Sequence, residues 1–187
     1  MALSATATLG GHSFSASRTA YIDGVAIPDA TITDRLVTLY SSGATPHLLT
    51  GIAFQESSYR QFEQKTLYGI SGRWPIESPS PALGQYVGMM QVPNGMSNAF
   101  DWLTNTSQGA NIFQGKLTDA SNYVAGLRSQ YPQLPALSGV ELENEALSRY
   151  GGFLDRYYTV NASGNGWVTT TREALLDYVS TIRGNMR

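Results

Sequence analysis

The stretch PHLLTGIAFQESSY, residues 46–59, decides how the rest of the chain is interpreted. It predicts a mostly apolar helix that opens at Pro46, where the first turn needs no backbone N–H, and ends on Glu56. The end of a helix carries partial negative charge, so a carboxylate there is disfavoured and its pKa is raised. A carboxyl group that stays protonated near neutral pH can act as a general acid, which makes Glu56 the first candidate functional residue.

The composition indicates one domain with an uncharged polar surface. The 187 residues are enough for a single substantial core. Only 14% of them are charged and the net charge is −2, with no basic run, which argues against nucleic acid as a partner. There is no cysteine, which excludes disulfides and thiol chemistry. A surface of Ser, Thr, Asn, Gln, Gly and Tyr suits neutral polar ligands such as sugars.

Residues 1–20 are rich in Ala, Ser, Thr and Gly, a composition that predicts a flexible leader or linker. Residues 1–11 carry no Lys or Arg and no long apolar stretch, so they do not match a signal peptide. No apolar run approaches the roughly 18–20 residues that cross a bilayer, and no membrane span is expected. A target outside the cytoplasm would then require another export route, or the chain is an excised domain.

Helical spacing of apolar residues recurs along most of the remaining chain. A short hairpin is expected at residues 21–28, with Asp23-Gly24 as its turn. We expect five to seven helices and little strand, which makes the domain all-α, or α+β dominated by helix. Besides 46–59, the helical segments are 33–43, 97–103, 109–127, 141–150 and a last helix that begins near Thr171.

Residues 63–87 are interrupted by glycine and proline and are expected to form one long loop. Loops of that length in compact domains are usually functional or disordered. The aromatic residues Tyr68, Trp74 and Tyr86 argue against plain disorder. Their rings either stack on sugar faces or form a small core within the loop.

Four short motifs follow one another in a fixed order. They are Gln55-Glu56-Ser57-Ser58-Tyr59, Gly88-Met89-Met90-Gln91-Val92-Pro93, Asn111-Ile112-Phe113-Gln114-Gly115, and Ala146-Leu147-Ser148-Arg149-Tyr150 followed by Gly151-Gly152. Together with Tyr178-Val179, they resemble the soluble lytic transglycosylase (SLT-like) type of domain in the lysozyme-like superfamily. The resemblance covers roughly residues 31–183. It implies that residues 21–187 form a mainly α, lysozyme-like catalytic domain.

The chain departs from the family pattern in two places. Residues 63–87 look like an insertion that flanks the cleft, because the family usually places the second motif nearer to the glutamate. Gly151 stands where the family usually has Asn, so any substrate contact made by that Asn is in doubt here.

The resemblance implies an enzyme that cleaves the peptidoglycan glycan strand between MurNAc and GlcNAc, with Glu56 as general acid and then base. In lytic transglycosylases the C6 hydroxyl of the sugar attacks the anomeric carbon, so a 1,6-anhydro ring forms and no water is consumed. The matched positions imply substrate contacts from Ser57, Gln91 and Tyr150, with Met90 in the wall of the cleft. No cofactor is expected, and no metal either, since no His, Asp and Glu cluster has metal-ligand spacing.

Two alternatives stay open from the sequence. Glu63 and Glu77 lie in the inserted segment, where a goose-type lysozyme relative could hold a second carboxylate, and the enzyme would then be a hydrolytic muramidase. The other alternative is a non-catalytic glycan-binding module. Gly151 in place of Asn favours that module mildly, whereas the presence of Glu56 opposes it, because a pure binder does not need an acid with a raised pKa.

The expected place of action is the periplasm or cell wall, where peptidoglycan lies. Without a recognisable signal peptide, delivery by a specialised machine is expected, either as a secreted antibacterial effector or as a phage component. An effector predicts a partner immunity or inhibitor protein that inserts into the cleft. The chain itself is expected to be a monomer.

Overall fold

The computed structural model describes residues 2–19, 24–67, 69–78 and 85–187. These residues form five α-helices and eight β-strands, and the strands pair into four separate two-stranded antiparallel sheets. Helix accounts for 44% of the structure and strand for 20%. The fold is therefore mixed α/β, and the expected mainly helical, lysozyme-like fold is wrong.

One hairpin precedes the first helix, and the other three strand pairs lie between helices. The helices are α1 (Asp29–Leu39), α2 (Leu48–Ser57), α3 (Trp102–Gln130), α4 (Gly139–Tyr150) and α5 (Glu173–Gly184). The strand pairs are β1 (Ala2–Leu9) with β2 (His12–Thr19), β3 (Phe62–Leu67) with β4 (Ile70–Pro75), β5 (Tyr86–Val87) with β6 (Val92–Pro93), and β7 (Tyr158–Val160) with β8 (Trp167–Thr169).

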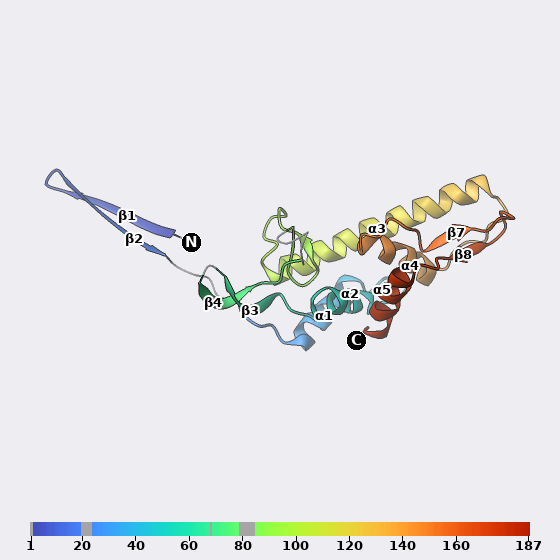
Figure 1. Cartoon of the computed structure of the whole chain (residues 1–187), viewed down its shortest axis with the longest axis horizontal. Coiled ribbons are helices and arrows are strands. Elements are labelled where there is room, and N and C mark those ends of the chain that lie inside the picture. Colours follow the sequence, from blue (N-terminus) through green and yellow to red (C-terminus); the bar gives the residue numbers. More distant parts are fainter. Residues whose placement is uncertain (1, 20–23, 68, 79–84) are drawn as a thin grey trace.

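The N-terminal segment expected to be a flexible leader is a β-hairpin that projects from one end of the molecule (Figure 1). Gly10 and Gly11 form its turn, with φ angles of 57° and 79°, as a two-residue turn of the mirror-image type requires. Within residues 5–17, Ser and Thr alternate with Ala, Leu and Phe. That period of two is the pattern of a strand, and its small-residue composition disguises it as a linker.

The segment expected to be a long loop, residues 63–87, also contains regular structure. Its first part forms the β3–β4 hairpin, in which Gly69 occupies the turn with φ 76° and Pro75 ends the second strand. Gly69 and Pro75 thus sit at the turn and at a strand end, where they are compatible with a hairpin, whereas Gly72 lies inside β4 opposite Lys65. Residues 79–84 and Tyr68 lie outside the described residues, as do residues 20–23 of the hairpin expected at 21–28.

Helix α2 lies in the middle of the core and is apolar on nearly all sides. Leu48, Leu49 and Ile52 have no exposed surface, which is typical of a helix surrounded by other elements. It packs closely on α5 through Gly51, where an added Cβ would lie 2.2 Å from the carbonyl oxygen of Ile182. This close approach holds α2 against α5 in the first half of α2.

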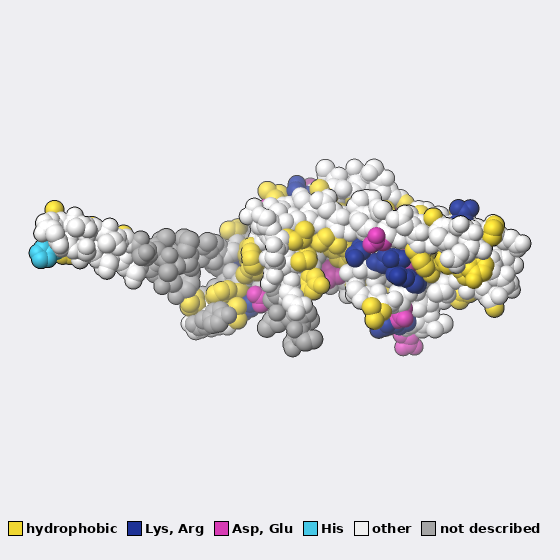
Figure 2. Space-filling view, turned by 90° about the horizontal axis from the view of Figure 1, so that it is seen from above, with side chains coloured by type: hydrophobic (Ala, Val, Ile, Leu, Met, Phe, Trp, Pro, Cys, Tyr) yellow, Lys and Arg dark blue, Asp and Glu magenta, His cyan; other side chains and the backbone are white. Residues whose placement is uncertain are grey.

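Two expected helices, at 97–103 and 109–127, are replaced by the single long helix α3. Asp101 caps its start, since its carboxylate accepts the backbone N–H of Thr104 at 2.8 Å. In the part of the chain that the structure describes, no helix combines the length and apolarity needed to cross a membrane. The face shown in Figure 2 is largely uncharged, with charged side chains in small groups.

Candidate functional site

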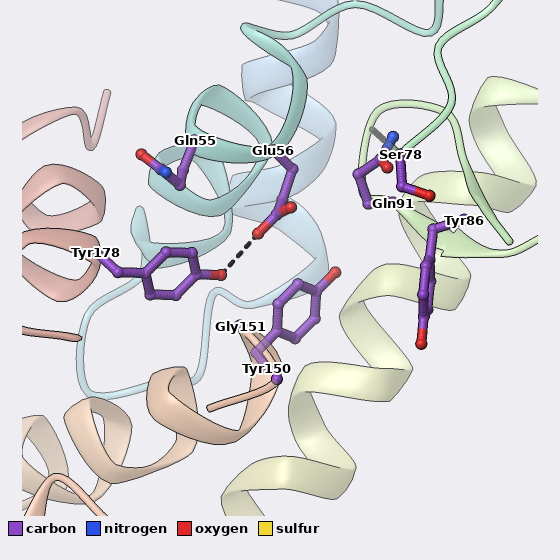
Figure 3. Close-up of a pocket in the computed structure, with 9 residues that line it drawn as sticks. Gln55, Glu56, Ser78, Tyr86, Gln91, Tyr150, Gly151 and Tyr178 are labelled. Atoms are coloured by element: carbon purple, nitrogen blue, oxygen red, sulfur yellow. Dashed lines mark hydrogen bonds between the residues drawn. The ribbon is translucent and has the colours of Figure 1, made fainter. Parts of the chain in front are cut away.

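A cavity of about 490 Å³ opens beside the end of α2 (Figure 3). Three of the four sequence motifs contribute to it, together with Tyr178 from α5; the third motif lies on α3 outside its lining. Among the described residues that line the cavity, Glu56 is the only acid, and there is no Lys, Arg or His. The lining residues are Gln55, Glu56, Ser78, Tyr86, Gln91, Tyr150, Gly151, Gly152 and Tyr178.

Glu56 lies in the last turn of α2 with its half-buried carboxyl group facing the cavity. Its Oε1 accepts a hydrogen bond from the Tyr178 hydroxyl at 2.7 Å, and its Oε2 has no partner among the described residues. Burial raises the pKa of Glu56, and the Tyr178 hydrogen bond offsets part of that rise. The direction agrees with the expectation from sequence, but the main cause is burial rather than the position at a helix end.

Tyr178 completes the pair and was not among the residues expected in the site. Its ring packs against the Phe153 ring at 5.4 Å between centroids, and burial together with the Glu56 charge raises its own pKa well above the ordinary value. The phenol therefore stays protonated and remains a hydrogen-bond donor to Glu56. The sequence signal that could have identified Tyr178 is the Tyr178-Val179 motif. Val179 of this motif is buried in the core, and Tyr178 precedes it on α5.

Ser57, expected to contact substrate, has a structural role at the end of α2. Its buried hydroxyl donates to the carbonyl oxygen of Ala53 at 3.1 Å and accepts the backbone N–H of Arg60 at 3.1 Å. It does not line the cavity. Ser58 and Tyr59 then adopt positive φ angles of 54° and 63°, which end the helix directly after the Glu56 turn.

The second motif is a tight turn held by two buried amide side chains that the sequence did not single out. Gln61 accepts the backbone N–H of Met89, and Asn105 accepts that of Met90, each at 2.9 Å. Gly88 has φ 77°, and an added Cβ there would lie 2.4 Å from Asn105 Nδ2. The turn therefore requires glycine both for its backbone angle and for the approach of Asn105.

This turn brings Gln91 to the cavity wall, across from Glu56 in Figure 3. The Gln91 amide donates to the carbonyl oxygen of Gly88 at 2.9 Å, so its direction is set by the turn itself. Met90, expected in the cleft wall, is fully buried and does not line the cavity. Its carbonyl oxygen accepts the Tyr150 hydroxyl at 2.8 Å. Tyr150 thus offers its ring to the cavity while its hydroxyl is engaged elsewhere.

The two candidate second carboxylates lie outside the cavity. Glu63 and Glu77 both approach Lys65, with Nζ to carboxylate oxygen distances of 3.1 and 3.9 Å. The neighbour of Glu77, Ser78, lines the cavity instead, because successive residues of extended chain point to opposite sides. The segment 79–84 reads PSPALG and contains no acidic residue.

Tyr86 provides an aromatic surface on the side of the cavity away from Tyr178 (Figure 3). It belongs to β5, where its backbone carbonyl accepts the N–H of Ser78 at 3.0 Å, and its side chain is 42% exposed. Trp74, the other described aromatic residue expected to stack on sugars, lines a different cavity near Phe62 and Trp102. Of the expected stacking residues in the described part of the chain, Tyr86 alone borders Glu56.

Comparison of the chain with protein-family models, with curated proteins and with solved structures finds no match. Within the described residues, no group of three or more His, Cys, Asp or Glu side chains could hold a metal ion. A functional assignment therefore depends on the chemistry of the Glu56 cavity.

Proposed function

We propose that this chain is a peptidoglycan lytic transglycosylase that cleaves between MurNAc and GlcNAc, with Glu56 as its general acid and base. One observation carries the proposal: a single carboxyl group with a raised pKa faces a cavity whose other described lining residues are uncharged. A reaction that needs one acid, and whose nucleophile belongs to the substrate, fits such a cavity better than a reaction that needs two carboxylates.

The proposed reaction begins with proton transfer from the Glu56 carboxyl group to the glycosidic oxygen. The bond between that oxygen and C1 of MurNAc breaks, and GlcNAc leaves with its 4-hydroxyl restored. The C6 hydroxyl of MurNAc bonds to C1 and gives its proton to the Glu56 carboxylate. The products are a 1,6-anhydroMurNAc end and a GlcNAc end, Glu56 is protonated again, and no water is consumed.

Tyr178 suits both halves of this cycle. Its hydroxyl stabilises the Glu56 carboxylate once the proton has left, which keeps the pKa from rising so far that the acid no longer donates. Burial acts in the opposite direction and keeps the resting group protonated more readily than an exposed glutamate. An acid balanced between these two influences can donate and then recover a proton.

The uncharged walls of the cavity suit a neutral glycan. Gln91 carries both a donor and an acceptor, which matches hydroxyl and N-acetyl groups. Tyr86 presents a ring that is free to stack on a sugar face. No positive side chain lines the described cavity, so an anionic ligand such as a nucleotide is disfavoured.

The hydrolytic alternative, a muramidase with Glu63 or Glu77 as the second carboxylate, is disfavoured by the ion pairs that both residues make with Lys65. The glycan-binding module is also disfavoured. The sequence feature that favoured this module was Gly151 in place of Asn. The structure gives a packing reason for the glycine, because a side chain there would collide with the Tyr178 ring. Because the substrate lies in the periplasm or cell wall, our proposal keeps delivery as a secreted effector or as a phage component.

The test is digestion of purified sacculi by the wild-type chain and by Glu56→Gln, followed by mass spectrometry of the products. We expect anhydro-muropeptides from the wild type and a loss of about 10³-fold in rate for the variant, the scale of general acid catalysis. Circular dichroism of the variant serves as the folding control. Products with ordinary reducing ends would indicate the muramidase, and a fully active Glu56→Gln protein would exclude Glu56 as the acid in either enzyme.

A further inference from the structure

Gly151 is the residue after Tyr150, at the C-terminal end of α4, and its backbone does not explain why it is glycine. Its φ and ψ angles are −69° and 3°, which any residue can adopt. Its N–H bonds to the carbonyl oxygen of Leu147 at 3.0 Å, as the end of a helix normally does. The reason for glycine must therefore lie in what surrounds the position.

The surroundings are two aromatic rings in contact with each other. A Cβ added to Gly151 would lie 2.8 Å from Cε1 and Cζ of Tyr178 and 2.9 Å from Cε2 of Phe153. Carbon atoms in favourable contact are roughly 3.5–4.0 Å apart, so both rings would have to move by more than about half an ångström. Phe153 packs against Tyr178, so neither ring can move independently of the other.

The displaced atom is the one that matters for Glu56. Cζ of Tyr178 carries the hydroxyl oxygen, and an aromatic ring is rigid, so a shift of Cζ moves the hydroxyl by a similar amount. That hydroxyl donates to Glu56 Oε1 at 2.7 Å, and O–H···O hydrogen bonds reach only about 3.0 Å, so a shift of more than about half an ångström away from Glu56 would break it.

We propose that Gly151 is a positioning residue: the missing side chain lets the Tyr178 ring lie where its hydroxyl reaches Glu56. The kinetic part of this inference rests on the proposed function, whereas the contact itself does not.

The groups that face Glu56 make the expected effect specific. Tyr178 from α5 donates to it, Tyr150 from α4 lies beside it with its hydroxyl on Met90, and the other described lining residues are uncharged. Loss of the Tyr178 donor removes a stabilisation of the carboxylate, so the pKa of Glu56 rises further. The titration midpoint of Glu56 should therefore move to higher pH.

The experiment is a ¹³C NMR titration of the glutamate carboxyl groups, in which the Glu56 signal is identified by its absence in Glu56→Gln. We expect Gly151→Ala and Tyr178→Phe each to raise the titration midpoint of Glu56. The double variant should match Tyr178→Phe alone, because the hydroxyl that Gly151 positions is then absent. Gly126→Ala is the matched control, since an added Cβ there meets nothing within 4 Å.

An unchanged midpoint in Gly151→Ala, or an effect that adds in full to that of Tyr178→Phe, would overturn the inference. If Gly151→Ala does not fold, Phe153→Leu replaces it: this change loosens the Tyr178 ring without adding an atom at Gly151. We expect a smaller rise of the Glu56 midpoint in Phe153→Leu, and no rise at all would overturn the inference.

A rate measurement on sacculi separates this inference from the proposed function. In Gly151→Ala the alkaline limb of the pH–rate profile should move to higher pH with the Glu56 midpoint, since the acid must be protonated to act. A shifted midpoint in a chain that never cleaves glycan would sink the function and keep the positioning role. Glycan cleavage with an unshifted Glu56 midpoint would support the proposed function and exclude the positioning role of Gly151.

Discussion

Glu56 on α2 and Glu143 on α4 are both shielded from water, but they differ in how many hydrogen-bond donors surround them. Glu143 on α4 has no exposed surface, and both of its oxygens are engaged. It accepts hydrogen bonds from Tyr40 at 3.1 Å and from the Thr45 N–H and hydroxyl at 2.8 and 2.6 Å, and it pairs with Arg183 at 3.0 Å. Glu56 has a single hydrogen-bond donor, the neutral Tyr178 hydroxyl, although each of the two carboxylates borders a cavity.

The difference separates a structural carboxylate from one suited to chemistry. Glu143 links α4, α5 and the segment after α1 through hydrogen bonds and an ion pair that engage both of its oxygens. Glu56 has too few donors to be a fully stabilised anion, and burial therefore shifts it toward the protonated form. A carboxyl group in that state, in contact with a cavity, is available for proton transfer.

Glu145 shows that a raised pKa alone does not identify such a site. Burial raises its pKa too, although Arg149 and the N–H groups of Tyr157 and Tyr158 lower it in part. It is fully buried and does not line the cavity beside Glu56. The cavity beside Glu56, rather than the pKa shift, distinguishes it from Glu145.

The largest effect on stability is expected from Glu143→Gln. The change leaves the Arg183 guanidinium largely buried without its counter-ion, and breaking a buried pair by removing one partner costs about 3 kcal/mol. Urea unfolding should show a lower midpoint with an unchanged slope. Glycan cleavage by the folded fraction should stay near the wild-type rate.

Arg183→Gln combined with Glu143→Gln provides the control. Because the unpaired charge is then removed as well, the double variant should be more stable than the sum of the single changes predicts. A Glu143→Gln protein as stable as the wild type would show that the hydrogen bonds and ion pair of Glu143 do not stabilise the fold. The comparison with Glu56 would then be wrong.

A smaller and opposite effect on stability is expected from Glu56→Gln. Since the folded state raises the pKa of Glu56 above its unfolded value, the stability this group contributes is fully present below the unfolded pKa and is lost as pH rises through the folded pKa. At neutral pH the variant should thus be more stable than the wild type.

Thermal unfolding of both proteins across pH 3–8 measures this difference. The two curves should meet below about pH 4, where an unfolded glutamate is protonated. A wild type that is the more stable protein at pH 8 would mean that Tyr178 outweighs burial, and Glu56 would then resemble Glu143.

The helices were largely foreseeable from the sequence, because their buried faces recur at helical spacing. The apolar run of α2 and the segments of α4 and α5 are such cases. The strands were not foreseen, because β1 and β2 are built from small residues and β7 and β8 have three residues each. Short pairs of this kind carry too little periodicity to be separated from loops.

The cavity was foreseen where a motif residue faces it directly, as Glu56, Gln91 and Tyr150 do. Ser57 was assigned to substrate although its hydroxyl belongs to the helix end, since a sequence does not give the direction of a side chain. Gln61 supports the second motif from 28 positions away, and such long-range hydrogen bonds leave no local pattern to detect.

The smallest effects are expected from Glu63→Gln and Glu77→Gln, which extend the comparison with Glu56 to two partly exposed carboxylates. Both carboxylates share Lys65 on a partly exposed hairpin, where an ion pair contributes roughly 0–1 kcal/mol. Neither borders the cavity, so we expect cleavage rates within about twofold of the wild type, measured on the same sacculi as Glu56→Gln. If either change lowered the rate as Glu56→Gln does, a second carboxylate would take part in the reaction. Glu56 would then no longer be the only acid on which the proposed reaction depends.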